Sequence, residues 1–201
     1  MKKVLIVFGV LAISLPFAYY FLKPTAENEE KKDTPMVVPN ISFEFTNQYG
    51  DTISADSLKG KIMVAEYFFT TCPTICPIMN DQMQKVQKAI KNRSDVVIMS
   101  FTVDPEKDTV EQLYRYAENH GAIRGKWHFL TGDKKKLYDF ARNSLYILRP
   151  EEAKNQADDG HDFIHTQYFV LVDKKLQIKG YYDGTDPREV EQLIYYIKNM
   201  K

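Results

Sequence analysis

The sequence is poor in cysteine, and it has no excess of charge of either sign. Only two of the 201 residues are cysteines, Cys72 and Cys76, too few to hold a domain of this size together by disulfide bonds. The two thiols are therefore more useful for chemistry than for architecture. Because 27 basic residues balance 27 acidic residues, nothing indicates the basic surface of a nucleic-acid-binding protein, and we expect no nucleic-acid partner.

Charge is also absent from one long stretch near the N-terminus. Residues 4–22 carry no charged side chain, and a helix of that length would span roughly 28 Å, close to the thickness of a bilayer's hydrocarbon core. Bulky residues end the stretch, whereas a cleaved signal peptide would end in small ones. We therefore expect residues 1–23 to form an uncleaved membrane anchor. Lys2 and Lys3 should stay inside, which leaves the rest of the chain outside the cytoplasm, on the periplasmic or cell-envelope face.

The remainder of the chain contains no internal repeat and no low-complexity segment. Residues 24–36 are charged and lack apolar periodicity, as expected of a flexible tether. Residues 37–201 are numerous enough to bury a core of their own. We therefore predict an anchor, a tether and one domain.

The apolar pattern of that domain alternates between the periods of strands and of helices. Residues 62–69 and 96–103 are almost wholly apolar and predict central strands covered on both faces. Other strands are expected in 41–54, in 127–130 and in a hairpin of QYFVLVD and LQIKGYYDG, and helices after 76, from 108 or 109 to 119, from 133 to 143 and from 187 to 199. This order predicts an α/β, thioredoxin-like fold with an added N-terminal β-hairpin and an insertion, 144–166, before the last β-hairpin.

Both cysteines fall in TTCPTICPIMN, between a predicted strand and a predicted helix. Such a junction lies at the mouth of an α/β sheet, where sites are usually built. The N–H groups and partial positive charge of a helix start favour thiolate over thiol and should lower a cysteine pKa. We expect Cys72 in the loop and Cys76 at the helix start, with Pro77 in the first turn. The two sulfurs could then share a soft metal ion or form a disulfide bond, whereas two small core residues would not need the neighbouring prolines.

A third ligand for such a metal would have to come from the four histidines. His120 lies at a helix end, where it suits the last carbonyl groups, and His128 is expected to face the surface from a short strand. His161 and His165 lie in GHDFIHTQYF, just before the strand QYFVLVD. In a thioredoxin-like sheet, the loop that leads into this strand runs beside the loop with the cysteines, so His165 could meet both sulfurs. Two thiolates and an imidazole suit copper or zinc.

Three motifs in this order resemble the SCO/SenC family. They are FFTTCPTICPIM, FTVDPEKDT, and DFIHT followed by YFVLVD, and the resemblance covers residues 37–199. Members of that family are membrane-anchored, thioredoxin-like proteins that help to build the dinuclear copper centre, CuA, of cytochrome c oxidase. The resemblance implies that Cys72, Cys76 and His165 bind copper as Cu(I) or Cu(II), and that the two cysteines form a redox-active dithiol.

The resemblance also implies partners, and it leaves some residues open. The expected partners are the copper-bearing subunit of cytochrome c oxidase, other copper carriers or thiol reductants, and the membrane through the N-terminal helix. Asp104 and Asp108 match the D-P-x-x-D-T loop of the family. Asp104 could orient the site or add a weak axial oxygen, and Asp108 is expected to cap a helix. His161 matches no position of the family motif and could be a fourth ligand, a first contact for the metal or a surface residue.

The predicted function is delivery of copper to the CuA site, reduction of the cysteines of that site, or both. The main alternative is a general thiol-disulfide oxidoreductase of the cell envelope, although its usual motif is C-x-x-C. A structural zinc site would combine C-x3-C with H-x3-H, but such sites usually support a domain with little core. A peroxide-reducing enzyme and a binding module that presents Tyr181 and Tyr182 are further alternatives.

Overall fold

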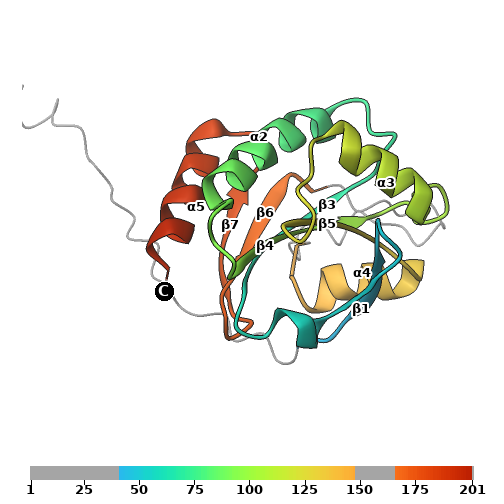
Figure 1. Ribbon diagram of the computed structural model, residues 1–201, viewed down its shortest axis with the longest axis horizontal. Helices are drawn as coiled ribbons and strands as arrows, with labels where there is room; N and C mark the ends of the chain where they lie inside the picture. Colours follow the sequence, from blue (N-terminus) through green and yellow to red (C-terminus); the bar gives the residue numbers. More distant parts are fainter. Residues whose placement is uncertain (1–40, 148–165, 201) are drawn as a thin grey trace, which may run out of the picture. The chain divides into compact units, whose positions relative to one another are not determined.

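One mixed sheet of seven strands, in the order β2-β1-β5-β4-β3-β6-β7, forms the centre of the computed structural model, which describes residues 41–147 and 166–200 (Figure 1). The strands are β1 (Glu44–Asn47), β2 (Thr52–Ser54), β3 (Ile62–Phe68), β4 (Val96–Thr102), β5 (Trp127–Thr131), β6 (Tyr168–Val172) and β7 (Ile178–Asp183). The helices are the short 3-10 helix η1 (Ala55–Leu58) and the α-helices α2 (Ile75–Ile90), α3 (Val110–Asn119), α4 (Lys134–Asn143) and α5 (Pro187–Asn199).

The middle of the sheet is built from parallel strands. All residues of β3 and β4 are buried, which explains why both segments are almost wholly apolar. β3 pairs in parallel with β4, and β4 pairs in parallel with β5. The carboxyl ends of these three strands therefore lie at the same edge of the sheet, and the cysteine loop leaves β3 at that edge.

Antiparallel hairpins extend the sheet on both sides. β1 pairs with β2 and with β5, and β6 pairs with β3 and with β7. In the β3–β6 pair, Ala65 lies opposite Val170 and Met63 lies opposite Val172. Because these strands run in opposite directions, β6 begins beside the end of β3. The chain that leads into β6 therefore approaches the edge from which the cysteine loop departs.

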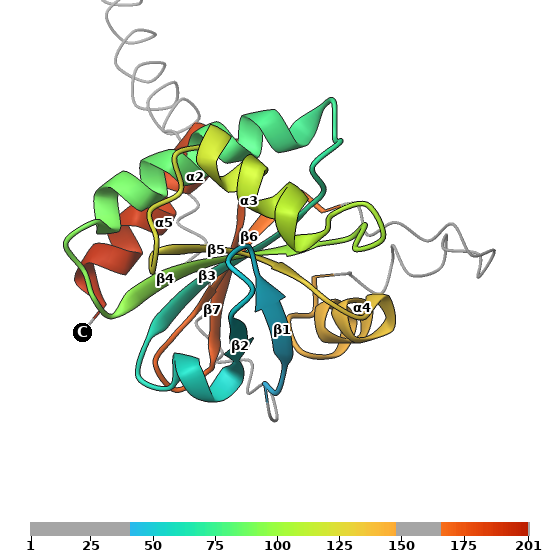
Figure 2. The same cartoon turned by 45° about the vertical axis from the view of Figure 1, so that its right-hand side comes forward.

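Helices cover the two faces of the sheet unequally. The views in Figures 1 and 2 place α2, α3 and α5 on one face, which we call the α2 face, and α4 on the other. The core of the α2 face contains the fully buried rings of Trp127, Phe129 and Phe169. The core of the opposite face contains Phe101 and Phe140 with side chains of α4 and η1. Two apolar layers therefore stabilise one central sheet.

Capping side chains set the starts of three helices. The hydroxyl oxygen of Thr109 accepts a hydrogen bond from the backbone N–H of Gln112, and Asp133 caps α4 in the same way. Asp186 caps α5, and Pro187 occupies its first turn. At the start of α2, Thr74 makes no such side-chain bond. The backbone N–H groups at the start of α2 are therefore free to bond other acceptors, and the sulfur of Cys72 is one of them.

The predicted thioredoxin-like α/β fold is confirmed in the part of the chain that the structure describes, including the added N-terminal hairpin and the closing hairpin. The predicted anchor (1–23) and tether (24–36), and most of the predicted insertion (144–166), lie outside the described residues. Within 41–147 and 166–200, no helix is both long enough and apolar enough to cross a membrane. The division into anchor, tether and domain stays a prediction.

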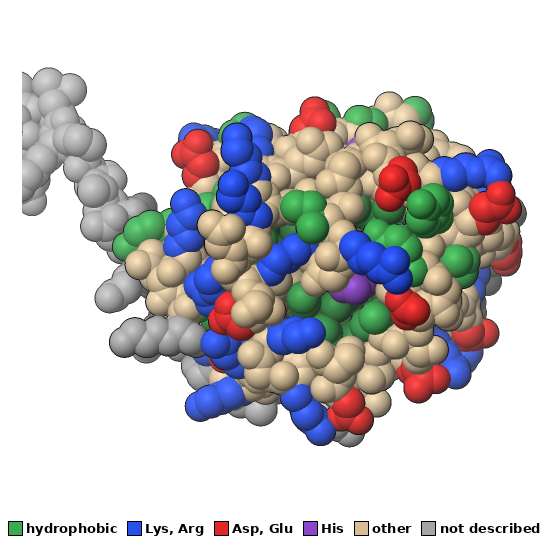
Figure 3. Space-filling view, in the orientation of Figure 1, with side chains coloured by type: hydrophobic (Ala, Val, Ile, Leu, Met, Phe, Trp, Pro, Cys, Tyr) green, Lys and Arg blue, Asp and Glu red, His purple; other side chains and the backbone are tan. Residues whose placement is uncertain are grey.

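The surface carries charges of both signs. Figure 3 shows basic and acidic side chains interspersed over the face in view, in keeping with the equal numbers of the two in the sequence. Within 41–147 and 166–200, the large apolar side chains that are exposed include Ile78 of the first turn of α2. The exposed side chain of Ile78 therefore lies within the cysteine motif, two residues after Cys76.

Candidate metal centre

The two cysteines lie where the sequence places them, at the junction of β3 and α2. Cys72 lies in the loop, half-buried, and its backbone N–H donates to the carbonyl oxygen of Phe69 at 3.2 Å. Cys76 is the second residue of α2, and its side chain is 3% exposed. Both are free thiols, and their side chains are within hydrogen-bonding reach of each other. One thiol therefore faces outward while the other lies beneath it in the core.

The environment of Cys72 favours its thiolate. Partial burial works against the charged form, but hydrogen bonds from the backbone N–H groups of Thr74 and Cys76 and from the thiol of Cys76 outweigh it, so that the pKa of Cys72 is lowered. The hydroxyl of Thr74 lies 3.9 Å from the same sulfur. The free N–H groups at the start of α2 thus serve Cys72, as expected for a sulfur at a helix start.

The environment of Cys76 has the opposite effect. Burial raises the pKa of the Cys76 thiol well above its usual value, and the nearby Cys72 and Glu66 raise it further, while a backbone N–H donated by Phe69 opposes the shift. A helix start therefore lowers the pKa of only one of the two cysteines. At Cys76 the cost of burying a charge outweighs the helix dipole.

The D-P-x-x-D-T loop fastens the cysteine loop to β4 through Asp108. The carboxylate of this fully buried residue accepts hydrogen bonds from the backbone N–H of Thr70 at 3.2 Å, from the hydroxyl of Thr70 at 2.5 Å and from the hydroxyl of Thr102. Burial raises the pKa of Asp108, although these hydrogen bonds counteract the effect. The prediction that Asp108 caps a helix is wrong: Thr109 is the cap of α3, and Asp108 holds Thr70, two residues before Cys72, in place.

Asp104, the other acidic residue of that loop, is occupied by its own neighbours. Its carboxylate pairs with the ammonium group of Lys107 at 3.0 Å, and its backbone N–H donates to the hydroxyl oxygen of Thr102 at 2.9 Å. These contacts stabilise a turn at the end of β4. They support a role in ordering the loop, and the suggested axial oxygen stays a prediction.

The two predicted histidines of the insertion, His161 and His165, lie outside the described residues. Among the residues that are described, no three His, Cys, Asp or Glu side chains could together hold a metal ion. Thr166, the first described residue after the gap, is buried and leads directly into β6. Since β6 begins beside the end of β3, the chain next to His165 lies at the edge of the sheet that carries Cys72.

The other two histidines have partners elsewhere. Nδ1 of His120 lies 2.8 Å from the carbonyl oxygen of Tyr116, at the end of α3 where it was expected. His128 is not the surface residue that was expected: it is half-buried, its Nδ1 lies 3.4 Å from Nδ2 of Asn47, and burial lowers its pKa. Both histidines are accounted for by local packing.

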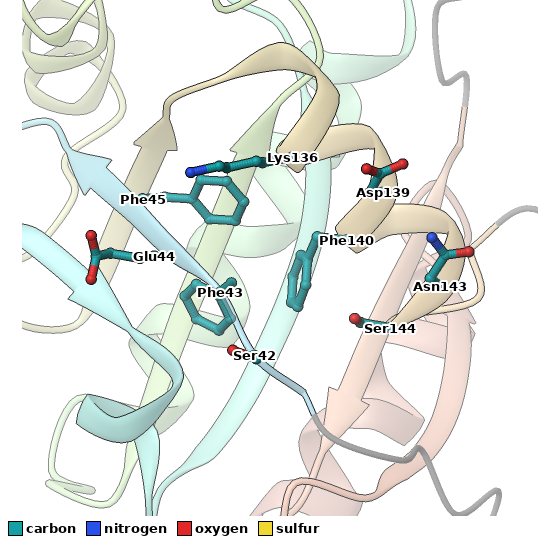
Figure 4. A pocket seen from close by; sticks show the side chains of 9 residues that line it. All are labelled: Ser42, Phe43, Glu44, Phe45, Lys136, Asp139, Phe140, Asn143 and Ser144. Carbon is teal, nitrogen blue, oxygen red and sulfur yellow. The ribbon is translucent and has the colours of Figure 1, made fainter.

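A shallow hollow lies on the α4 side of the sheet, between β1 and α4. Phe43, Phe45 and Phe140 form its apolar wall, and Lys136 and Asp139 lie among its polar residues (Figure 4). The elements that line it do not carry the cysteines.

Tyr181 and Tyr182, which could have faced a partner, are parts of the fold instead. The hydroxyl of Tyr181 donates to the carbonyl oxygen of Leu145 at 2.9 Å, and Tyr182 is buried.

Comparison with known proteins agrees with this geometry. A sequence profile of the SCO1/SenC family matches residues 31–200. The chain belongs to the SCO1/SenC family. The match extends over the whole described part of the chain, so the resemblance carried by the three motifs is confirmed.

Similar proteins of this family align with most of this chain. The SCO1 protein homolog of Bacillus subtilis is 36% identical over 160 residues, which are 78% of this chain and 80% of the relative. A SCO1/SenC family lipoprotein from Bacillus anthracis has a structure with a TM-score of 0.71 and 30% identity, covering 83% of this chain and 97% of that chain. BsSco, a member of the Sco family of cytochrome c oxidase assembly proteins in which a disulfide switch was identified, has a TM-score of 0.69 and 33% identity, covering 84% and 96%.

Sco structures with copper bound are also among the similar folds. ScoI of Arabidopsis thaliana, solved with copper bound, has a TM-score of 0.60 and 23% identity, and it covers 78% of this chain and 96% of that chain. At this identity the likeness concerns the fold. The bound copper is a property of that ScoI.

Proposed function

We propose that this protein is a copper-binding assembly factor that delivers copper to the CuA site of cytochrome c oxidase, reduces the cysteines of that site, or does both. The observation that carries the proposal is the pair of free thiols, Cys72 and Cys76, within hydrogen-bonding reach at the start of α2. Its relatives support the choice of copper and of the oxidase, because a Sco protein with copper bound and a Sco protein described as an oxidase assembly protein share this fold.

In this proposal, Cys72, Cys76 and His165 hold the copper ion, which is cargo rather than a permanent part of the protein. Two thiolates are soft ligands that favour Cu(I), and an imidazole helps to accept Cu(II). The residues fit such an ion by chemistry, since the outward sulfur of Cys72 already favours its thiolate. His165 precedes Thr166, which leads into β6 beside the end of β3.

The same two sulfurs make metal binding and disulfide formation mutually exclusive. A disulfide bond between Cys72 and Cys76 uses both sulfurs and leaves neither thiolate for copper. Oxidation of the pair would therefore release the ion, and reduction would restore the site. Binding requires that both thiols lose their protons and that His165 is neutral, so copper affinity should fall in acid.

The proposed place of action is the outer face of a membrane. Residues 1–23 would be the anchor, 24–36 the tether, and 37–201 the domain that reaches a membrane-bound partner. The Bacillus anthracis relative is described as a lipoprotein, which is a different means of attachment. The partner would be the copper-bearing subunit of the oxidase, with other copper carriers or thiol reductants as donors.

A copper titration of the reduced protein tests this proposal. We expect wild type to bind one equivalent of copper. In Cys72→Ala or His165→Ala the copper affinity should fall by at least about tenfold, because the loss of a ligand should reduce the affinity no less than the loss of a residue that supports a ligand. His120→Ala is the matched control, since His120 already bonds Tyr116. A titration that is unchanged after Cys72→Ala would exclude the site.

A general thiol-disulfide oxidoreductase is the second candidate, and the lowered pKa of Cys72 favours it. A half-buried thiolate above a buried partner thiol suits attack on a disulfide bond. The two candidates differ in their need for His165. If His165→Ala leaves disulfide reduction intact but removes copper, both chemistries belong to one site, whereas reduction without copper binding in wild type would leave only the oxidoreductase.

A further inference from the structure

Basic side chains from four separate parts of the chain gather at the edge of the sheet opposite the cysteines. β3, β4 and β5 are parallel, so all three strands begin at this edge, and β6, which runs antiparallel to β3, ends there. The cations come from the chain just before β3, between α2 and β4, just before β5 and in the turn between β6 and β7. They are Lys61, Arg93, Lys126 and Lys174, and we call them the basic edge.

Contacts around Asp95, which directly precedes β4, hold the basic edge together. The Asp95 carboxylate accepts hydrogen bonds from Nε of Arg93 at 2.7 Å and from Nη2 of Arg93 at 2.8 Å. The same carboxylate pairs with Nζ of Lys174 at 2.8 Å. Nζ of Lys126 donates to the backbone carbonyl oxygen of Arg93, and the charges of Arg93 and Lys61 both act on it. The four cations therefore form one cluster in space.

The basic edge carries more positive charge than Asp95 balances. Four positive charges face the one negative charge of this carboxylate, which leaves the cluster with a net charge of +3. Burial lowers the pKa of Lys126, and repulsion from Arg93 and Lys61 lowers it further, against the attraction of Asp95. Among the charges of both signs in Figure 3, basic side chains are concentrated toward the side on which α5 ends (Figure 1). Crowding of like charges costs free energy, and a negatively charged surface would offset that cost.

The turn between β6 and β7 extends the basic edge toward solvent. Lys175, next to Lys174, is exposed. Asp173, which begins the turn, is occupied by other groups: its carboxylate pairs with Nζ of Lys179 at 3.4 Å and accepts the backbone N–H of Lys175 at 2.8 Å. The ammonium group of Lys175 is therefore available to a negatively charged surface.

Two exposed tyrosines lie beside the basic edge, near the end of α5. Arg93 fastens this helix end, since its guanidinium group donates to the carbonyl oxygens of Ile197 at 3.0 Å and of Met200 at 3.1 Å. Tyr195 and Tyr196, which directly precede Ile197, are 65% and 44% exposed. Cations at a helix end are common, but cations together with exposed tyrosines are typical of a membrane interface, where both kinds of side chain meet lipid headgroups.

We propose that the basic edge docks on the headgroups of an anionic membrane surface, with Tyr195 and Tyr196 at its rim, and thereby turns the cysteine-bearing edge of the sheet away from the lipid. The inference deepens the proposed function and rests on the membrane attachment of that proposal: the anchor keeps the domain near the bilayer, and the basic edge sets its orientation. β3 spans the two edges with seven residues, so the loop of Cys72 would stand roughly 23 Å above the headgroups. The dithiol then faces the part of a membrane-bound partner that projects from the bilayer.

The test compares the full chain in lipid nanodiscs of phosphatidylcholine alone and of phosphatidylcholine mixed with anionic phosphatidylglycerol. Acetylation by an N-hydroxysuccinimide ester, followed by mass spectrometry for each lysine, reports how accessible each amine is. In the anionic discs the lysines of the basic edge and Lys175 should react at least about fivefold more slowly than in the neutral discs, because each cation near an anionic surface favours docking by a factor of about five. High salt should abolish this protection, since it screens the attraction between the cations and the lipid.

Two matched variants separate the basic edge from positive charge in general. Lys174→Glu/Lys175→Glu reverses two charges of the turn, and the remaining lysines of the basic edge should then react in anionic discs as fast as in neutral discs. Lys135→Glu/Lys136→Glu makes the same change of net charge on α4, which starts just beyond the carboxyl end of β5, and it should leave the protection in place. The comparison of the two discs needs wild type only, so it holds even where a variant does not fold.

Equal acetylation of the basic edge in the two discs would overturn the inference, and so would protection that survives Lys174→Glu/Lys175→Glu. Protection that requires the soluble domain of a partner rather than anionic lipid would assign the edge to a protein and would also overturn it. A copper titration of the same chain tests the proposed function separately. Docking lost with copper binding intact overturns this inference alone, whereas copper binding lost with docking intact overturns the copper proposal alone.

Discussion

At the scale of single residues, burial decides the chemistry of groups that look alike in the sequence. Cys72 and Cys76 belong to one short motif, yet hydrogen bonds lower the pKa of the first while burial raises that of the second. The two thiols therefore differ in how readily each one forms a thiolate. Glu66 shows the same principle, because a carboxyl group in the core keeps its proton up to a higher pH than a carboxyl group in water does.

Glu66 should make the stability of the fold depend on pH. A pKa raised from 4.5 to about 7 means that the folded state holds a proton which the unfolded state has already released. The free energy of unfolding should therefore fall as pH rises from about 4.5 to 7, by roughly 3 kcal/mol from this group, and should change little above that.

Urea unfolding of wild type and Glu66→Gln at a series of pH values measures this contribution. The difference between the two proteins should vary with pH in the stated window, since other carboxyl groups contribute equally to both. A constant difference would contradict the assignment of a raised pKa to Glu66.

At the scale of elements, the site is assembled where strand ends and helix starts meet. The start of α2 directs its free N–H groups to Cys72, and the loop between β4 and α3 fastens the cysteine loop through Asp108. Asp108 and Thr109 are adjacent in the chain but act on different elements. Thr109 caps α3, and Asp108 bonds Thr70 and Thr102.

These two neighbours offer a matched pair of substitutions. Thr109→Ala removes one capping bond and should lower the free energy of unfolding by about 1 kcal/mol. Asp108→Ala removes a buried carboxylate that accepts three bonds and leaves two hydroxyl groups without their acceptor, so we expect a loss of about 3 kcal/mol. Chemical unfolding measures both values. An Asp108→Ala loss no larger than that of Thr109→Ala would contradict the role of Asp108 as the link between the loops.

At the scale of the whole molecule, a two-layered core supports an edge at which distant segments converge. β3, β4 and β5 end at this edge, and β6 begins beside β3. The sheet does not need a metal ion to form, since both of its faces are covered by apolar side chains. Copper would therefore bind to a folded domain and add to its stability.

Thermal unfolding with Cu(I) under anaerobic conditions tests this expectation. At a free copper concentration about 100 times the dissociation constant, binding should add about 2.7 kcal/mol. For a domain of this size the midpoint should rise by roughly 5–10 °C. The double variant Cys72→Ala/Cys76→Ala should show no rise, and a copper-dependent rise of equal size in that variant would place the ion elsewhere.

The order of the elements and the location of the dithiol follow from the sequence alone. Periodicity is a local property, so the buried runs of β3 and β4, the helix after Cys76 and the closing hairpin are all legible from neighbouring residues. The motifs of the SCO1/SenC family can also be recognised in the sequence, because each of them is a short continuous stretch. The assignment of His165 as a ligand stays a prediction, since it lies outside the described residues.

Which of these residues meet, and in what surroundings, depends on how the chain folds. The sequence offers both Asp108 and Thr109 as caps of α3, because it shows their neighbours along the chain but not the bond from Asp108 to Thr70, 38 positions away. Glu66 stands inside an apolar run, where the sequence signals it only as one charged residue in a buried strand. Burial, electrostatic coupling and a missing hydrogen-bond partner depend on residues brought together by folding, and they decide which groups can carry protons and charge.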